Sequence, residues 1–134
     1  MSVLLGSCLC SKVSFECNDE FEQFHLCHCI QCQKVTGSAH ASNLFTSPQN
    51  IKWLTGLEFV KRFDVPGRTI STAFCTECGS AVPYLSLSGE ALIVPAGSLD
   101  STATLMPQDN IFCSEKATWY DDALKAIQFN EFPE

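Results

Sequence analysis

The placement of its cysteines constrains this chain more than any other feature of the sequence. Seven of the nine fall into a group of three and a group of four: Cys27, Cys29 and Cys32 in one, and Cys8, Cys10, Cys75 and Cys78 in the other. A closed zinc site takes four protein ligands, whereas a reactive zinc site has three and keeps one position open. The sequence therefore predicts two zinc ions per chain, one structural and one catalytic.

The group of four consists of two pairs whose spacings each bring two sulfur atoms to one metal. Side chains alternate along a strand, so Cys8 and Cys10 are expected to point the same way. Cys75 and Cys78 bracket a short turn, and the Gly79 that follows can take a positive φ. Cys10 and Cys75 are 65 residues apart, which is typical of a structural zinc that holds the amino-terminal strand against the domain centre. The alternative is four unrelated core cysteines, since free cysteine is often buried.

The group of three can reach one ion without a distant partner, so its fourth ligand is open. The alternatives are solvent, substrate, or one of four side chains, namely His25, His28, Cys17 and Cys113. His28 lies inside the motif, but in an extended segment it points away from Cys27 and Cys29. Three thiolates give a zinc site a net charge near −1, which favours a soft ligand such as a thiol. A metal-free redox cluster and an iron–sulfur cluster are the competing hypotheses.

Composition narrows the class of protein. A chain of 134 residues fits a single domain, 1–134, and no apolar run approaches the ~20 residues needed to cross a bilayer. The first residues lack a signal-peptide pattern, which indicates the cytoplasm, where cysteines serve as metal ligands rather than disulfides. The formal charge is −7 with only eight Lys and Arg residues, so we expect neither nucleic acid nor membrane as a partner.

Short β-type segments separated by turn residues predict a mainly β, antiparallel, meander-like domain. The expected strands are 13–17, 21–26, 39–45, 51–54, 58–65, 69–74 and 91–94. Helix is expected only over 30–35, ended by Gly37, and weakly over 121–128, where Leu124 and Ile127 would share a face. The last stretch, 129–133, is expected to be an extended tail packed by its phenylalanines.

Three stretches resemble the family of glutathione-dependent formaldehyde-activating enzymes and centromere-protein-V-like proteins. They are Gly6-Ser7-Cys8-Leu9-Cys10, Cys27-His28-Cys29-Ile30-Gln31-Cys32 with Lys34 and Gly37 after it, and Phe74-Cys75-Thr76-Glu77-Cys78-Gly79-Ser80. The order and spacing of seven cysteines agree with that family. Two positions depart from its pattern: Gln33 stands where an arginine is common, and Asn110 where a histidine is common.

This resemblance implies a β-tent fold, a structural zinc on the four-cysteine group and a catalytic zinc on Cys27, Cys29 and Cys32. It also implies a carbon–sulfur lyase activity that adds glutathione or a similar thiol to formaldehyde or another small aldehyde. Lys34 is the residue we expect to contact a substrate carboxylate, while Lys61, Arg62 and Arg68 are interpreted as the outer face of a hairpin. A non-catalytic zinc module that binds a partner or carries a thiol is the alternative.

Overall fold

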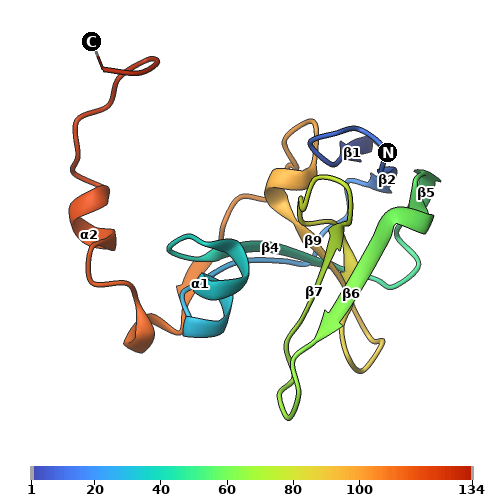
Figure 1. The fold of residues 1–134 in the computed structure, drawn as a ribbon, viewed down its shortest axis with the longest axis horizontal. Helices are drawn as coiled ribbons and strands as arrows, with labels where there is room; N and C mark the ends of the chain where they lie inside the picture. The colour runs from blue at the N-terminus through green and yellow to red at the C-terminus, as the bar shows by residue number, and fades with distance from the viewer. Residues whose placement is uncertain (1, 134) are drawn as a thin grey trace.

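The computed structural model describes residues 2–133 and consists mainly of three β sheets (Figure 1). The first sheet is antiparallel, in the order β1 (Val3–Ser7), β2 (Ser14–Asn18) and β5 (Lys52–Thr55). The largest has the order β10 (Asp109–Ile111), β3 (Gln23–Cys27), β4 (Ala41–Thr46), β9 (Leu92–Pro95) and β8 (Tyr84–Leu85). The third is a hairpin of β6 (Val60–Asp64) and β7 (Ser71–Cys75). The mainly β fold predicted from the sequence is confirmed.

Helical structure is short. It comprises α1 (Ile30–Thr36), α2 (Tyr120–Ala123) and three 3₁₀ turns at Leu57–Phe59, Ala96–Ser98 and Cys113–Glu115. The predicted turn of helix over 30–35 is confirmed. It ends at Gly37, which has φ +64° and donates its N–H to the carbonyl of Gln33 at 2.8 Å. This left-handed conformation favours glycine and closes the helix one residue after Thr36.

Each β segment predicted from the sequence overlaps a strand, but the meander is interrupted. β10 pairs with β3 in parallel, with Ile111 opposite Cys27. A chain segment from near the carboxyl terminus therefore lies beside the strand that leads into the three-cysteine motif. The prediction of a purely antiparallel arrangement is wrong at this edge, because β10 is reached by a long connection rather than by a hairpin.

Two clusters of buried side chains form the core. The larger consists of Leu4, Phe15, Cys17, Phe24, Leu44, Leu92, Val94 and Ala103, and the smaller of Cys8, Val13, Ala73, Cys75 and Val82. Trp53 contacts both clusters, and its ring lies 5.7 Å from that of Phe15, centroid to centroid. Since Cys8 and Cys75 belong to the smaller cluster, the four-cysteine group is continuous with the core.

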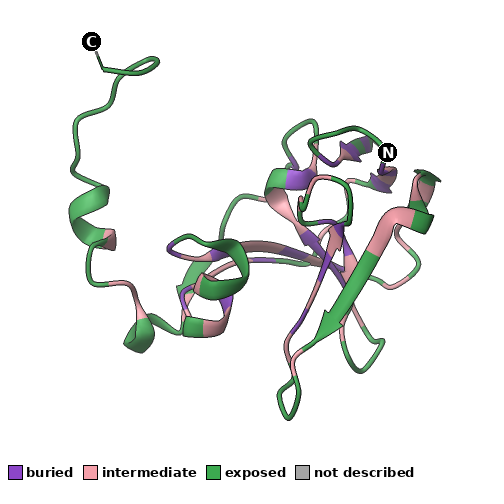
Figure 2. Cartoon of the chain, viewed as in Figure 1, coloured by how far each residue is buried: buried purple, intermediate pink, exposed green. Residues whose placement is uncertain are grey.

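The carboxyl-terminal segment projects away from the sheets and is almost entirely exposed (Figure 2). Helix α2 ends at Ala123, and Leu124 and Ile127 are 64% and 81% exposed, so the predicted helix over 121–128 is wrong in length and in its packed face. Phe129 and Phe132 are also exposed, so the expectation of a tail packed by its phenylalanines is wrong. Within residues 2–133, no helix is both long enough and apolar enough to span a membrane.

Candidate functional site

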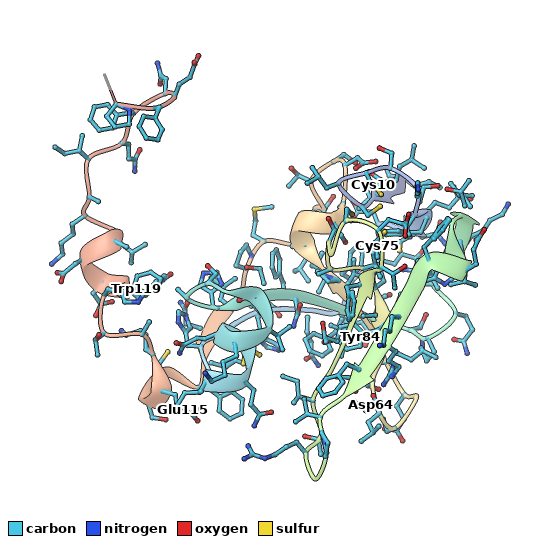
Figure 3. The ribbon with its side chains drawn as sticks, in the orientation of Figure 1. Cys10, Asp64, Cys75, Tyr84, Glu115 and Trp119 are labelled. Carbon is cyan, nitrogen blue, oxygen red and sulfur yellow. The ribbon has the colours of Figure 1, made fainter. Side chains whose placement is uncertain are left out.

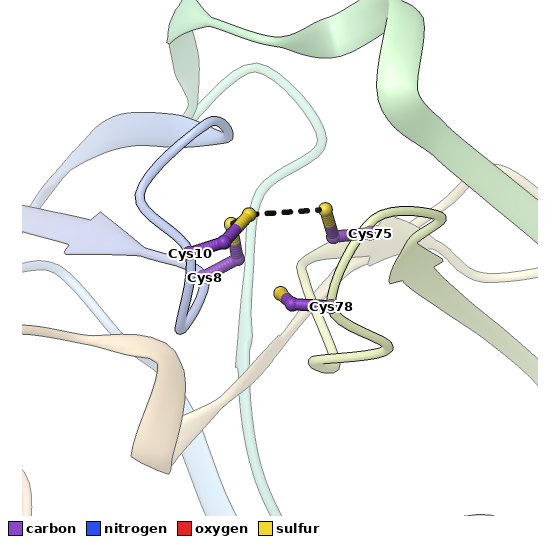
Figure 4. A group of neighbouring side chains, drawn as sticks. All are labelled: Cys8, Cys10, Cys75 and Cys78. Atoms are coloured by element: carbon purple, nitrogen blue, oxygen red, sulfur yellow. Dashed lines mark hydrogen bonds between the residues drawn. The ribbon is translucent and has the colours of Figure 1, made fainter.

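The four-cysteine group brings two turns together (Figure 4). Cys8 and Cys10 lie just after β1, Cys75 ends β7, and Cys78 lies in the turn that follows. Their sulfur atoms all lie within 4.8 Å of one another, with 3.5 Å between Cys8 and Cys10 and 3.8 Å between Cys10 and Cys75. A tetrahedral zinc with Zn–S bonds near 2.3 Å needs sulfur atoms about 3.8 Å apart. The donor set and its spacing therefore fit a closed zinc site.

The expectation that Cys8 and Cys10 lie along a strand is wrong. β1 ends at Ser7, and the chain must reverse at once because β2 pairs with β1. The reversal is a turn in which Ser11, at φ +67°, donates its N–H to the carbonyl of Cys8 at 3.0 Å. The two sulfur atoms converge through this turn rather than through the alternation of a strand.

The second turn follows the prediction more closely. Gly79 has φ +77° and donates its N–H to the carbonyl of Cys75 at 2.7 Å. Hydrogen bonding between Cys78 and Ser80, whose Oγ lies 3.3 Å from Cys78 Sγ, lowers the pKa of the Cys78 thiol to about 5. The backbone N–H of Glu77 donates to Cys75 Sγ at 3.4 Å. Donors aimed at sulfur stabilise the thiolate form, which is the form that binds zinc.

The three-cysteine group forms where β3 passes into α1. Cys27 is the last residue of β3, Cys29 is the N-cap of α1, and Cys32 lies in its first turn. Their sulfur atoms lie within 4.8 Å of one another, as the prediction of a shared ion requires. The Cys29 Sγ accepts the backbone N–H of Cys32 at 3.3 Å, so one thiol both caps the helix and belongs to the cluster.

Burial disfavours the thiolate form of two of these thiols, Cys27 and Cys32. Burial raises the pKa of the Cys27 thiol, and burial together with the neighbouring Cys29 raises the pKa of Cys32. A divalent ion reverses this preference, because it stabilises thiolate over thiol. Three soft donors at this spacing fit zinc with one further position.

Among the described residues, none of the four side chains considered as a fourth ligand joins the three sulfur atoms. His28 is fully buried, its Nε2 lies 2.8 Å from Asn110 Oδ1, and its ring packs against those of His40 and Tyr120, which also contact each other. Both ring nitrogens of His25 face oxygen atoms, Asp109 Oδ1 at 2.5 Å and Gln23 Oε1 at 3.0 Å.

Cys17 and Cys113, the two cysteines considered as a fourth ligand, have other surroundings. Cys17 belongs to the larger core cluster, where burial raises its pKa to about 11. Cys113 is exposed and its Sγ contacts the carbonyl of Asn110 at 3.6 Å. Among the described residues, neither joins the three sulfur atoms as a metal ligand.

A cavity of about 540 Å³ adjoins the three-cysteine group. All three cysteines line it, together with residues from β4, β9, the β6–β7 hairpin and the 3₁₀ turn at Cys113–Glu115. Figure 3 shows Glu115 and Tyr84, which line different parts of its wall. Much of the remaining wall is apolar, including Ile70, Ile93 and Phe112. A pocket of this size and character is typical of small-molecule sites.

The sequence did not indicate the cation on this wall. Arg68, interpreted as the outer face of a hairpin, lines the cavity. Lys34, expected to meet a substrate carboxylate, lines a separate shallow hollow of about 240 Å³ with Trp119. Burial raises the pKa of Tyr84, another wall residue missed from the sequence, to about 12. Arg68 and Tyr84 reach this wall from segments far from the thiols in sequence, so only the fold reveals them.

The two positions that depart from the family pattern both contact His28. The Gln33 side-chain amide donates to the carbonyl oxygen of His28 at 2.8 Å and to that of Glu115 at 2.9 Å. Asn110 contacts the His28 ring, and the His28 N–H donates to the carbonyl of Ile111 at 2.9 Å. Gln33 therefore ties the three-cysteine loop to the segment beside it, and does not itself line the cavity.

Comparisons with known proteins support the family resemblance seen in the sequence. The family model for glutathione-dependent formaldehyde-activating enzyme matches residues 3–115. Among solved structures, a Rhodobacter sphaeroides protein is similar at a TM-score of 0.60 and 20% identity, over 79% of this chain and 98% of that one, which is a likeness of fold. The curated proteins give no match. The matched residues include both cysteine groups and the cavity wall, and the chain belongs to the glutathione-dependent formaldehyde-activating enzyme family.

Proposed function

We propose that this chain is a zinc-dependent enzyme of the carbon–sulfur lyase type, which promotes the reversible addition of glutathione or a similar thiol to formaldehyde or another small aldehyde. The observation that carries the proposal is a three-thiol cluster on the wall of a cavity of about 540 Å³. Three protein ligands leave a place for substrate, whereas four would serve structure alone. The description of the family names both formaldehyde and glutathione.

In this proposal Cys27, Cys29 and Cys32 hold the catalytic zinc at the cavity wall. When bound, zinc supplies a charge that favours the thiolate form of an incoming thiol, which is the nucleophilic form. The reaction joins the thiol sulfur to the aldehyde carbon, and the proton lost from sulfur ends on the aldehyde oxygen. His25 and Glu115 also line the cavity and are of residue types that exchange protons.

The four-cysteine group has a structural role in this proposal, and residues 1–134 act as one domain. Its ligands are part of the smaller core cluster, and its closed donor set has no position left for substrate. The alternative of a zinc module without turnover would be favoured by a side chain blocking the open position. His28, the residue inside the motif, is directed to Asn110 instead, which supports the catalytic proposal.

The test is to mix pure zinc-loaded protein with formaldehyde and a panel of thiols, and to follow adduct formation by proton NMR against the spontaneous rate. We expect acceleration with at least one thiol, and loss of the acceleration in Cys29→Ser. Absence of acceleration with every thiol and aldehyde would refute the proposal. Equal acceleration by the Cys29→Ser variant would refute the assignment of the three-cysteine group as the site.

A further inference from the structure

The charges around the cavity are unevenly distributed. Arg68 is the one Lys or Arg among the described residues that line it, and its side chain makes no ion pair within residues 2–133. Arg62, on the same hairpin, already has hydrogen-bond partners: its Nε lies 2.8 Å from Asp64 Oδ1 and an Nη lies 3.0 Å from Ser71 Oγ. Arg68 is therefore a guanidinium on a cavity wall without a carboxylate of its own.

The backbone holds Arg68 in the turn of the β6–β7 hairpin. Its N–H donates to the carbonyl of Val65 at 3.2 Å, and Gly67 before it has φ +70°. The thiols come from β3 and α1, so the positive charge and the metal-binding group are supplied to one cavity by different elements. The wall that they share includes Ile70, Tyr84 and Ile93. A ligand that satisfies all of these features has a thiol, an apolar stem and a negative group.

The charge balance limits the ligand to one carboxylate. A zinc ion with three thiolates has a net charge near −1, and Glu115 adds a carboxylate to the same wall. Among the described residues of the lining, Arg68 is the one Lys or Arg that opposes these charges, and the other basic side chain, His25, already faces Asp109 Oδ1. A guanidinium binds a carboxylate with two parallel hydrogen bonds. A second carboxylate on the ligand would have no cation on the wall and would remain in water.

We propose that Arg68 is a specificity-determining residue that binds the carboxylate of the thiol substrate, and that the site selects thiols by one carboxylate. This inference rests on the proposed function, because it assigns the part of the substrate that does not react. A charge-assisted hydrogen-bonded pair of this kind is expected to change affinity by roughly ten- to a hundredfold. It also makes Arg68, rather than Lys34, the cation that matters for substrate.

The experiment compares three thiols: 3-mercaptopropionate, its neutral amide, and mercaptosuccinate with two carboxylates. Binding to the zinc-loaded protein is measured by calorimetry, and adduct formation with formaldehyde is measured in parallel. The variants are Arg68→Gln and the matched control Lys34→Gln, which removes a cation outside the cavity. Both positions are exposed, so neither change is expected to disturb folding.

We expect wild-type protein to bind 3-mercaptopropionate at least tenfold more tightly than its amide, and mercaptosuccinate no more tightly than 3-mercaptopropionate. Arg68→Gln should abolish the preference for the acid while leaving binding of the amide unchanged, and Lys34→Gln should keep it. Equal binding of acid and amide, or an unchanged preference in Arg68→Gln, would overturn the role of Arg68. Markedly tighter binding of mercaptosuccinate would overturn the limit of one carboxylate. If binding follows the expected pattern but no thiol is accelerated, the proposed function fails and the carboxylate site stands.

Discussion

Replacing one cysteine in each group separates the structural site from the reactive one. The two variants are Cys78→Ser and Cys29→Ser, which each remove one sulfur and change the side chain by a single atom. We expect Cys78→Ser to unfold or become insoluble. We expect Cys29→Ser to remain folded and to lose about one zinc ion of two per chain.

The magnitude for the four-cysteine group follows from the distance between its ligands along the chain. Cys10 and Cys75 are 65 residues apart, so the unfolded chain does not hold the four sulfur atoms together. Binding energy is then almost wholly folding energy, and a structural zinc supplies about 10 kcal/mol or more. Since a domain of this size has a total stability of about 5–15 kcal/mol, losing the metal leaves little or none.

The opposite holds for the three-cysteine group. Its ligands stand within six residues, so the unfolded chain also binds the metal, and metal binding then stabilises the folded state much less. Cys29 also caps α1 by accepting the N–H of Cys32, and serine is among the best residues at that position. The expected cost of Cys29→Ser is therefore about 1 kcal/mol or less.

The assays are elemental analysis for zinc per chain, and thermal unfolding followed by circular dichroism. Addition of a chelator to the wild-type protein should reproduce the Cys78→Ser result. Equal loss of fold in the two variants, or a folded Cys78→Ser beside an unfolded Cys29→Ser, would refute the division into one structural and one reactive site.

Three further changes test other parts of the structure. Gly6→Ala should destabilise by about 1–3 kcal/mol in denaturant unfolding, because an added Cβ would lie 2.1 Å from the buried ring of Phe15; an unchanged midpoint would contradict this contact. Truncation before Leu124 should leave the unfolding midpoint within about 2 °C, since the side chains of 124–133 are exposed, and a larger drop would show that the tail packs. Hydrogen bonds from a serine hydroxyl and from Arg62 lower the pKa of Asp64, so its stabilising effect is complete above about pH 4 and is lost as the pH falls through the lowered value. The difference in unfolding free energy between wild type and Asp64→Asn should therefore become smaller below pH 4. A difference that stays constant with pH would refute this role of Asp64.

Sequence reasoning succeeded where the chemistry is local. The convergence of the sulfur atoms within each cysteine pair depends on two or three residues of backbone. The end of α1 likewise depends on Gly37, which directly follows it. The β segments were found because alternating apolar residues reflect burial on one face, as in β2, where Phe15 and Cys17 are buried between less buried polar neighbours. Local patterns of this kind need no knowledge of which segments are neighbours.

Sequence reasoning failed where the position of a residue in the fold depends on contacts with distant segments. β10 has only three residues, and it is a strand because it pairs with β3, which lies more than 80 residues earlier in the chain. Arg68 looks like any surface cation until the hairpin is placed over the cavity. In the sequence Gln33 is only a departure from the family pattern, and the fold alone reveals its bonds to two carbonyl groups. The tail misled because its apolar residues suggested packing, which the structure does not provide.

The contact between His28 and Asn110 has a consequence for the order in which the protein is made. The two residues are 82 positions apart, so at about 5–20 residues per second the ribosome needs about 4–16 s to go from one to the other. During that interval the three thiols around His28 have left or are leaving the ribosome, and the strand that will lie beside them does not yet exist. Until Asn110 and Ile111 are made, the loop lacks the contacts with them that hold it in the finished protein.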